Sequence, residues 1–369
     1  MFAEGQRLRA EFGADAVADL SIGQPLEATA AVREAFAQGA RDDFPGRFGY
    51  MANSGYPELR ERCAADVAVA GVSAQSITMS CGAAGAIALA LRAFVDGGST
   101  VIGVAPYFPE FRLYATTAGC HFSAVAARTD LTLDLEALAA ALTPETGAVL
   151  LNSPCNPSGH LLSGYELRDV AELLQAHNQR HNRRVVLIVD EVYRRLLFAP
   201  ATRSEPFDYY ETTVLARSFS KDLGVAGERI GYLAVHPSMT SATTERGLEM
   251  CSRALGFVNA PATAQRALLR LSSWEVDIAP YQQRRDAALL ACSAAGIEAT
   301  PPDGGLYLWA RSPWPDTVTF VDALAQRRVL VTPGVAFGVD SHFRICFSQP
   351  LAALQLARGA LSKIVASAS

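Results

Sequence analysis

The sequence "RSFSKDLGVAGERIGY", residues 217–232, places one lysine, Lys221, among small, hydroxylated and glycine residues. It directly follows the apolar run "TTVLA", residues 212–216, which predicts a buried β-strand. Ser218 and Ser220 precede the lysine, and Arg229 follows it eight positions later. Binding sites in open α/β sheets form just beyond the C-terminal ends of strands. We therefore expect Lys221 to lie in such a site and its surroundings to form an α/β sheet.

The sequence around this stretch alternates between helical patterns and short apolar runs. Strands are predicted at 100–105, 121–127, 147–154, 184–191 and 212–220, and helices lie between most of them. This alternation predicts an α/β fold, with a mainly parallel sheet between layers of helices in a large domain. After residue 275 the pattern changes to that of a smaller α+β domain. We predict that residues 41–275 form the large domain, and that 276–369 form the small domain together with the N-terminal segment 1–40.

Composition and charge exclude several classes of protein. Half of the 369 residues are hydrophobic, and the formal net charge is −5 without a basic run, which argues against nucleic acid or an anionic membrane as a partner. The most apolar stretch, residues 81–94, is interrupted by Arg92 and is too short to span a bilayer. The seven cysteines form no CxxC pair and the histidines show no ligand spacing, so we expect reduced thiols in a cytoplasmic protein and no metal site.

Polar residues follow several of the predicted strands and precede one predicted helix. Asn156 follows the strand at 147–154, whereas Asp190 and Tyr193 follow the apolar residues 185–189. The glycine turn at 82–85 begins the helix "AAGAIALAL". Because the C-terminal ends of parallel strands meet at one edge of a sheet, we expect these groups to lie close to Lys221.

This set of groups is suited to one particular cofactor. A dry site beside another cation lowers the pKa of a lysine, so that it can react as an amine. The free N–H groups at the start of a helix attract a phosphate, and Arg229 and the two serines could bind the same phosphate. A strand-end aspartate can pair with a protonated pyridine nitrogen. A reactive lysine with such an aspartate is the signature of pyridoxal phosphate.

The chain closely resembles the fold-type I pyridoxal-phosphate enzymes, specifically the class I/II aminotransferases. The resemblance runs almost from end to end, and the motifs occur in the order and spacing of that family. They are "LSIGQP", "YMANSGYPELR", "CGAAGA", "APYFPEF", "NSPCNPSGHLL", "VDEVYRRLLF", "SFSKDLGVAGERIGY", "GFVNAPA", "GLYLW", "VLVTPGVAFG" and "FRICFS".

The resemblance implies a role for each matching residue at the cofactor. Lys221 would hold pyridoxal 5′-phosphate through a Schiff base and later move a proton at the substrate Cα. Asp190 would keep the pyridine nitrogen protonated, and Tyr193 and Asn156 would bond the ring oxygen. Phe108 would stack on the ring, although Tyr107 is only one position away. The phosphate would be bound by the following residues: Ala83 and Ala84 through backbone N–H groups, and Ser218, Ser220 and Arg229 through side chains.

Other matching residues imply a substrate and a partner. Arg344 would bind the α-carboxylate of an amino acid in a two-pronged fork, and the loop at Gly23 would touch the same carboxylate. Tyr50 matches a tyrosine that reaches the phosphate of a neighbouring subunit, which implies a homodimer with sites shared across its interface. Arg253 lies near the position of an arginine that binds a side-chain carboxylate, but it is displaced by about one residue, so this role stays open.

Three functions remain as alternatives. The first is an aminotransferase that moves an amino group between an L-amino acid and a 2-oxo acid. The second is a pyridoxal-phosphate enzyme of amino-acid-derived metabolism that catalyses β- or γ-elimination, replacement or cyclisation; Lys221, Asp190 and Arg344 would serve both. The third, a cofactor-sensing transcription regulator, is disfavoured because the sequence shows no basic helix-turn-helix. The motifs do not identify the natural amino donor and acceptor or the pathway.

Overall fold

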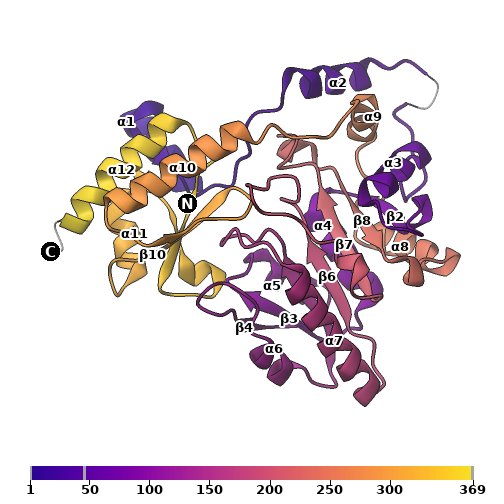
Figure 1. Ribbon diagram of the computed structural model, residues 1–369. Coiled ribbons are helices and arrows are strands. Elements are labelled where there is room, and N and C mark those ends of the chain that lie inside the picture. Colours follow the sequence, from indigo (N-terminus) through magenta and orange to yellow (C-terminus); the bar gives the residue numbers. More distant parts are fainter. Residues whose placement is uncertain (1, 45–46, 367–369) are drawn as a thin grey trace.

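The computed structural model describes residues 2–44 and 47–366 and contains one large and two smaller β-sheets (Figure 1). The large sheet has seven strands in the order β2-β8-β7-β6-β5-β3-β4. In sheet order, these are Ile77–Ser80, Gly231–Val235, Thr213–Ser218, Val186–Asp190, Thr146–Asn152, Thr100–Ala105 and His121–Ala126. Only β8 runs antiparallel to its two neighbours; all the other pairings are parallel. The mainly parallel sheet predicted from the sequence is therefore confirmed.

The central strands are apolar along their whole length because both faces of the sheet are covered. In β5, Val149 and Leu151 belong to one buried cluster, while Ala148 and Leu150 belong to another on the opposite face. The same alternation continues in β6, as expected for a parallel strand buried on both sides. The helices of this region are α3 (Pro57–Val67), α4 (Gly82–Phe94), α5 (Glu110–Thr117), α6 (Leu135–Ala141), α7 (Gly164–His181), α8 (Ala242–Ala254) and α9 (Ala262–Arg270).

Several helix boundaries follow directly from local sequence. The side chain of Ser163 accepts a hydrogen bond from the backbone N–H of Glu166, and the Glu166 carboxylate accepts one from the backbone of Ser163, which forms a capping box at the start of α7. The helix ends at Asn182, which adopts a left-handed conformation with φ of 48°. Asp134 caps α6 in the same way as Ser163 caps α7, by accepting a bond from a backbone N–H.

The second region is built around a four-stranded antiparallel sheet in the order β12-β13-β10-β9. Its strands are Thr332–Pro333, His342–Cys346, Tyr307–Arg311 and Ala299–Thr300. A parallel pair, β1 (Ala18–Asp19) and β11 (Val329–Leu330), joins the N-terminal segment to it. The helices are α1 (Phe2–Phe12), α10 (Ala279–Ala294), α11 (Thr317–Gln326) and α12 (Leu351–Ala366), and α10 packs along α12 (Figure 1). Short 3₁₀ helices span Ala14–Ala16, Ala74–Ser76, Pro206–Asp208, Ala226–Glu228, Pro237–Met239 and Gly334–Phe337.

Helix α2 (Ala30–Arg41) lies against α9, which belongs to the range predicted as the large domain. Gly39 allows this close approach, because an added Cβ would lie 3.2 Å from the backbone nitrogen of Ala267 and 3.2 Å from the carbonyl oxygen of Thr263. The segment 1–40 is thus divided: β1 pairs with β11 of the smaller region, whereas α2 packs on α9. The exact domain boundaries at residues 40 and 275 stay a prediction.

The register of the central strands places the polar strand ends side by side. Asn152 at the end of β5 is the partner of Asp190 at the end of β6, and Asp190 is the partner of Ala216 in β7. Lys221 follows β7 by three residues. The sheet therefore brings an amide, a carboxylate and a lysine to one edge. Within the residues described, no helix is long and apolar enough to cross a membrane.

Candidate active site

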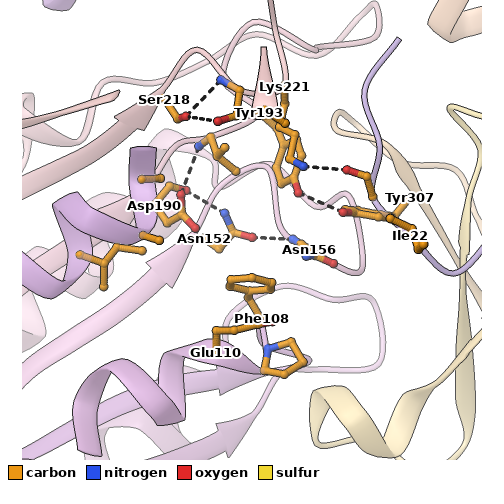
Figure 2. A pocket seen from close by; sticks show the side chains of 18 of the residues that line it. Ile22, Phe108, Glu110, Asn152, Asn156, Asp190, Tyr193, Ser218, Lys221 and Tyr307 are labelled. Carbon is orange, nitrogen blue, oxygen red and sulfur yellow. Dashed lines mark hydrogen bonds between the residues drawn. The ribbon is translucent and has the colours of Figure 1, made fainter. Parts of the chain in front are cut away.

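A cavity of about 570 Å³ lies at this edge of the large sheet and extends to the smaller region. Figure 2 shows side chains from both regions around it. Twelve of the thirteen residues predicted to form the site line it. These are Gly23, Ala83, Ala84, Phe108, Asn156, Asp190, Tyr193, Ser218, Ser220, Lys221, Arg229 and Arg344. The structure thus brings together residues that are separated by more than 300 positions in the sequence.

Lys221 reaches into the cavity from the turn after β7. Its Nζ donates a hydrogen bond of 2.6 Å to the carbonyl oxygen of Gly23 (Figure 2). Burial lowers the pKa of Lys221, and the positive charges of Arg229 and Arg344 lower it further, against opposing effects of Cys346 and Asp190. A lysine in this environment carries a larger fraction of neutral, nucleophilic amine than an exposed lysine does.

Asp190 ends β6 and is buried within the site. Its Oδ1 accepts a bond of 3.2 Å from the backbone N–H of Val192, while Asn152 donates to its carbonyl oxygen at 2.8 Å (Figure 2). Burial raises the pKa of Asp190 to about 7, and the backbone bond from Val192 and the charge of Lys221 only partly offset this rise. The carboxylate therefore lacks a cation strong enough to compensate its burial, and a protonated ring nitrogen in the cavity would supply one.

The start of α4 is suited to binding a phosphate. Its N-cap residue, Cys81, makes no side-chain cap, so the first backbone N–H groups of the helix are free to bind an anion. Arg229 lies directly beside this turn: its Nη2 donates to the carbonyl of Cys81 at 3.2 Å. Ser218 donates to Ser220 at 2.8 Å between their hydroxyl oxygens, and both hydroxyls line the same cavity.

Phe108, and not Tyr107, lines the cavity. In Figure 2 the ring of Phe108 lies below Asn156, whereas Lys221 and Tyr193 lie above Asn156. Tyr107 is buried elsewhere, with its ring 5.0 Å from that of Phe122 between centroids. The geometry of the site therefore favours Phe108 as the aromatic residue that packs on a bound ring.

Arg344 is buried, and its guanidinium is held by three hydrogen bonds. Nη1 donates to Asn156 Oδ1 at 2.9 Å, and Nη2 donates to the Ser21 carbonyl at 2.6 Å and to Thr332 Oγ1 at 3.3 Å. Its Nε is buried without a partner in the described part of the chain. An unpaired buried donor beside a cavity is a site for an acceptor on a ligand, and a carboxylate matches the planar guanidinium.

Tyr307 is a site residue to which the sequence assigned no role. The hydroxyl of Tyr193 donates to the hydroxyl of Tyr307 at 3.2 Å (Figure 2), and the Tyr307 ring lies 4.3 Å from the Arg344 guanidinium. An added Cβ at Gly23 would collide with the Tyr307 hydroxyl, so only glycine fits there. Tyr307 belongs to the motif "GLYLW", and this motif was the only feature of the sequence that could have pointed to Tyr307 as a site residue. Ser21, Asn152, Thr332, Phe337 and Glu110 also line the cavity without having been predicted.

Two residues that the sequence singled out do not join this cavity. Tyr50 is 95% exposed and is absent from the lining residues. Arg253 lies exposed in the last turn of α8 and is absent as well. Neither side chain therefore contributes to the cavity of the chain that carries it.

The groups in the cavity fit pyridoxal 5′-phosphate. The buried carboxylate of Asp190 lacks a strong cation, which the protonated ring nitrogen would supply. The uncapped start of α4 suits the phosphate, and Lys221, with its lowered pKa, suits the aldehyde carbon. The unpaired donor of Arg344 suits the carboxylate of a substrate. In the described ranges, 2–44 and 47–366, no group of three or more His, Cys, Asp or Glu side chains could hold a metal ion.

Comparisons with known proteins agree with this chemistry. The family described as "Aminotransferase class I and II" matches residues 15–361. The chain is 28% identical over 341 residues to a probable aspartate aminotransferase of Methanocaldococcus jannaschii, which covers 89% of this chain and 88% of that protein. It is 29% identical over 354 residues to a probable aspartate/prephenate aminotransferase of Thermus aquaticus, with 91% and 88% covered.

A solved structure gives the same result for the fold. An aminotransferase from Eubacterium rectale superposes with a TM-score of 0.93 at 28% identity, over 99% of this chain and 94% of that one. The family match spans nearly the whole sequence and includes every residue that lines the cavity. The chain therefore belongs to the class I and II aminotransferases, a family of enzymes that depend on pyridoxal phosphate.

Proposed function

We propose that this enzyme transfers an amino group between an L-amino acid and a 2-oxo acid, with the cofactor held on Lys221. The observation that carries the assignment is the convergence of Lys221, Asp190 and Arg344 on one cavity, each in the environment its role requires. When bound, pyridoxal phosphate supplies an electron sink that stabilises the negative charge left on a substrate Cα after its proton is removed.

We assign the cofactor contacts to residues that line one continuous surface. Asp190 would place a negative charge beside the ring nitrogen, Tyr193 and Asn156 would donate to the ring oxygen, and Phe108 would pack on the ring face. The phosphate would lie at the start of α4. Its remaining ligands would be the backbone of Ala83 and Ala84 and the side chains of Ser218, Ser220 and Arg229.

The substrate would bind between Arg344 and Lys221. Arg344 would orient the amino acid by its α-carboxylate, with help from the loop at Gly23. The amine of Lys221, released from the cofactor when the substrate amine takes its place, would then remove the proton from Cα and return it to the former aldehyde carbon. The bond from Lys221 Nζ to the Gly23 carbonyl holds the amine at the side of the cavity where Arg344 binds the Ser21 carbonyl, so the proton acceptor and the carboxylate site are adjacent.

We also propose that the protein is a homodimer in the cytoplasm. Tyr50 and Phe48 are 95% and 79% exposed, and large exposed aromatic side chains are typical of interfaces. Tyr50 of one subunit would reach the phosphate of the other. All seven cysteines are free thiols in the structure, which is typical of a reducing compartment.

A half-reaction assay tests the proposed reaction. The purified enzyme, loaded with pyridoxal phosphate, is mixed in separate experiments with L-alanine, L-glutamate or L-aspartate in the absence of any 2-oxo acid. A transaminase converts the bound aldehyde form to the amine form and releases one equivalent of 2-oxo acid, whereas a lyase or cyclase regenerates the aldehyde. Lys221→Ala serves as the control and should bind the cofactor without completing the conversion. Regeneration of the aldehyde without an added oxo acid would instead support elimination or cyclisation.

A further inference from the structure

One charged side chain in the cavity has no part in the proposed binding of cofactor or α-carboxylate. Five charged residues line the cavity: Glu110, Asp190, Lys221, Arg229 and Arg344. The last four have roles at the ring nitrogen, the aldehyde carbon, the phosphate and the α-carboxylate. The carboxylate of Glu110 lines the same cavity but has no role assigned to it.

The carboxylate of Glu110 forms no ion pair in the described part of the chain. Glu110 is the first residue of α5 and follows Phe108 by two positions. Its Oε2 is buried and has no hydrogen-bond partner in the described part of the chain, and no described basic side chain pairs with it. The start of a helix favours a negative charge, but that interaction does not supply a donor to the buried oxygen.

The charge of Glu110 acts on two walls of the cavity. Burial raises the pKa of Tyr114 to about 12, and the negative charge of Glu110 adds to that shift. Burial also raises the pKa of Tyr307, with a smaller contribution of the same sign from Glu110. Both tyrosines line the cavity, so a ligand between them lies in the field of this carboxylate.

Glu110 lines the cavity without an ion-pair partner in the described part of the chain, and a cation on a ligand in the cavity would pair with its carboxylate. We propose that Glu110 determines substrate specificity by selecting amino acids whose side chain ends in a cation, such as a second amino group. This inference rests on the proposed function, since it concerns the side chain of the amino acid held by Arg344. The same carboxylate repels a side-chain carboxylate, and neither Arg253 nor any unassigned arginine lines the cavity to offset that repulsion.

Matched pairs of substrates test this inference. Each diamino acid is compared with the amino acid that lacks its terminal amino group: L-2,4-diaminobutyrate with L-2-aminobutyrate, L-ornithine with L-norvaline, and L-lysine with L-norleucine. The rate constant for conversion of the bound cofactor to its amine form gives kcat/KM for each. In the unmutated enzyme, we expect at least one diamino acid to exceed its counterpart about tenfold or more. Glu110→Gln should reduce that ratio about tenfold, because the amide carries no charge.

A second glutamate provides the control. Glu136 also lies in the first turn of a helix, α6, but is exposed and outside the cavity. Glu136→Gln should leave the ratio unchanged. If Glu110→Gln slowed both members of each pair equally, or changed only the melting temperature, Glu110 would serve the helix or pair with a cation of another subunit, and the inference would be wrong. It would also be wrong if the unmutated enzyme preferred L-aspartate or L-glutamate to every diamino acid.

L-Alanine separates this inference from the proposed function. An enzyme that converts L-alanine but shows no preference within any pair retains the proposed function and refutes the role of Glu110. An enzyme that converts L-aspartate or L-glutamate but none of these amino acids likewise retains the proposed function and refutes the role of Glu110. An enzyme that converts no L-amino acid, L-aspartate and L-glutamate included, refutes both. Binding of the cofactor, followed by its absorbance, checks that Glu110→Gln is folded and loaded before the ratios are compared.

Discussion

Replacing Arg344 by lysine should separate the recognition of amino acids from that of simple amines. The guanidinium uses Nη1 and Nη2 to bond Asn156, Ser21 and Thr332. It also lies 4.3 Å from the ring centroid of Tyr307 and 4.8 Å from that of Phe337. A lysine has one nitrogen, so it cannot keep these bonds and also present two parallel donors to a carboxylate.

The expected effect follows from this burial. Losing one member of a buried, charge-assisted pair costs on the order of 2–5 kcal/mol. We therefore expect kcat/KM for L-alanine to fall by about 30- to 5000-fold in Arg344→Lys, mainly through a higher KM. Ethylamine is alanine without its α-carboxylate and does not use the fork, so its kcat/KM should change far less. The absorbance of the bound cofactor should be nearly unaffected.

The assay follows the conversion of the cofactor to its amine form in a single turnover, with L-alanine or ethylamine at several concentrations. Melting curves of both proteins check that the variant is folded. Equal rates on alanine and ethylamine in the unmutated enzyme would show that Arg344 does not bind the α-carboxylate. The site would then take an amine or an ω-amino substrate, and the substrate class proposed here would be wrong.

Three further predictions concern the cofactor site. Asp190→Asn should keep the fold but reduce turnover about 100-fold or more, because an amide cannot stabilise a protonated ring nitrogen; near-normal turnover would show that the acid is misassigned. Tyr307→Phe, which removes the acceptor of the Tyr193 hydrogen bond, should shift the pKa of the Lys221-bound chromophore by up to about one unit, and an unchanged pKa would exclude this coupling. Light scattering should show a dimer, and Tyr50→Phe should weaken cofactor binding; a fully active monomer would contradict the shared site.

The sequence predicted the strand ends well because hydrophobic runs show where buried strands stop. Asn156, Asp190 and Lys221 each follow such a run, and the parallel register brings the three to one edge of the sheet. Arg344 and Gly23 could be placed only through the family resemblance, since nothing in the local sequence predicts that residues so far apart share a cavity.

The features that were missed depend on tertiary packing. The bond between Tyr193 and Tyr307 joins residues 114 positions apart, and neither the hydroxyl partner nor the contact with Gly23 leaves a local pattern. Glu110 looks like an ordinary acidic residue at the start of a helix, and only the folded cavity shows that its Oε2 is buried without a donor. Similarly, α2 packs on α9 through a close approach at Gly39. A glycine within a helical pattern does not by itself predict that another helix comes so near.

The central claim is that Lys221 holds the cofactor. The most direct test is to reduce the loaded enzyme with borohydride, digest it and identify the modified peptide by mass spectrometry. We expect a single phosphopyridoxyl group, attached to the lysine in "SFSKDLG", and no stable label in Lys221→Ala. A label on the other lysine, Lys363, or a protein that takes up no pyridoxal phosphate at all, would contradict the assignment.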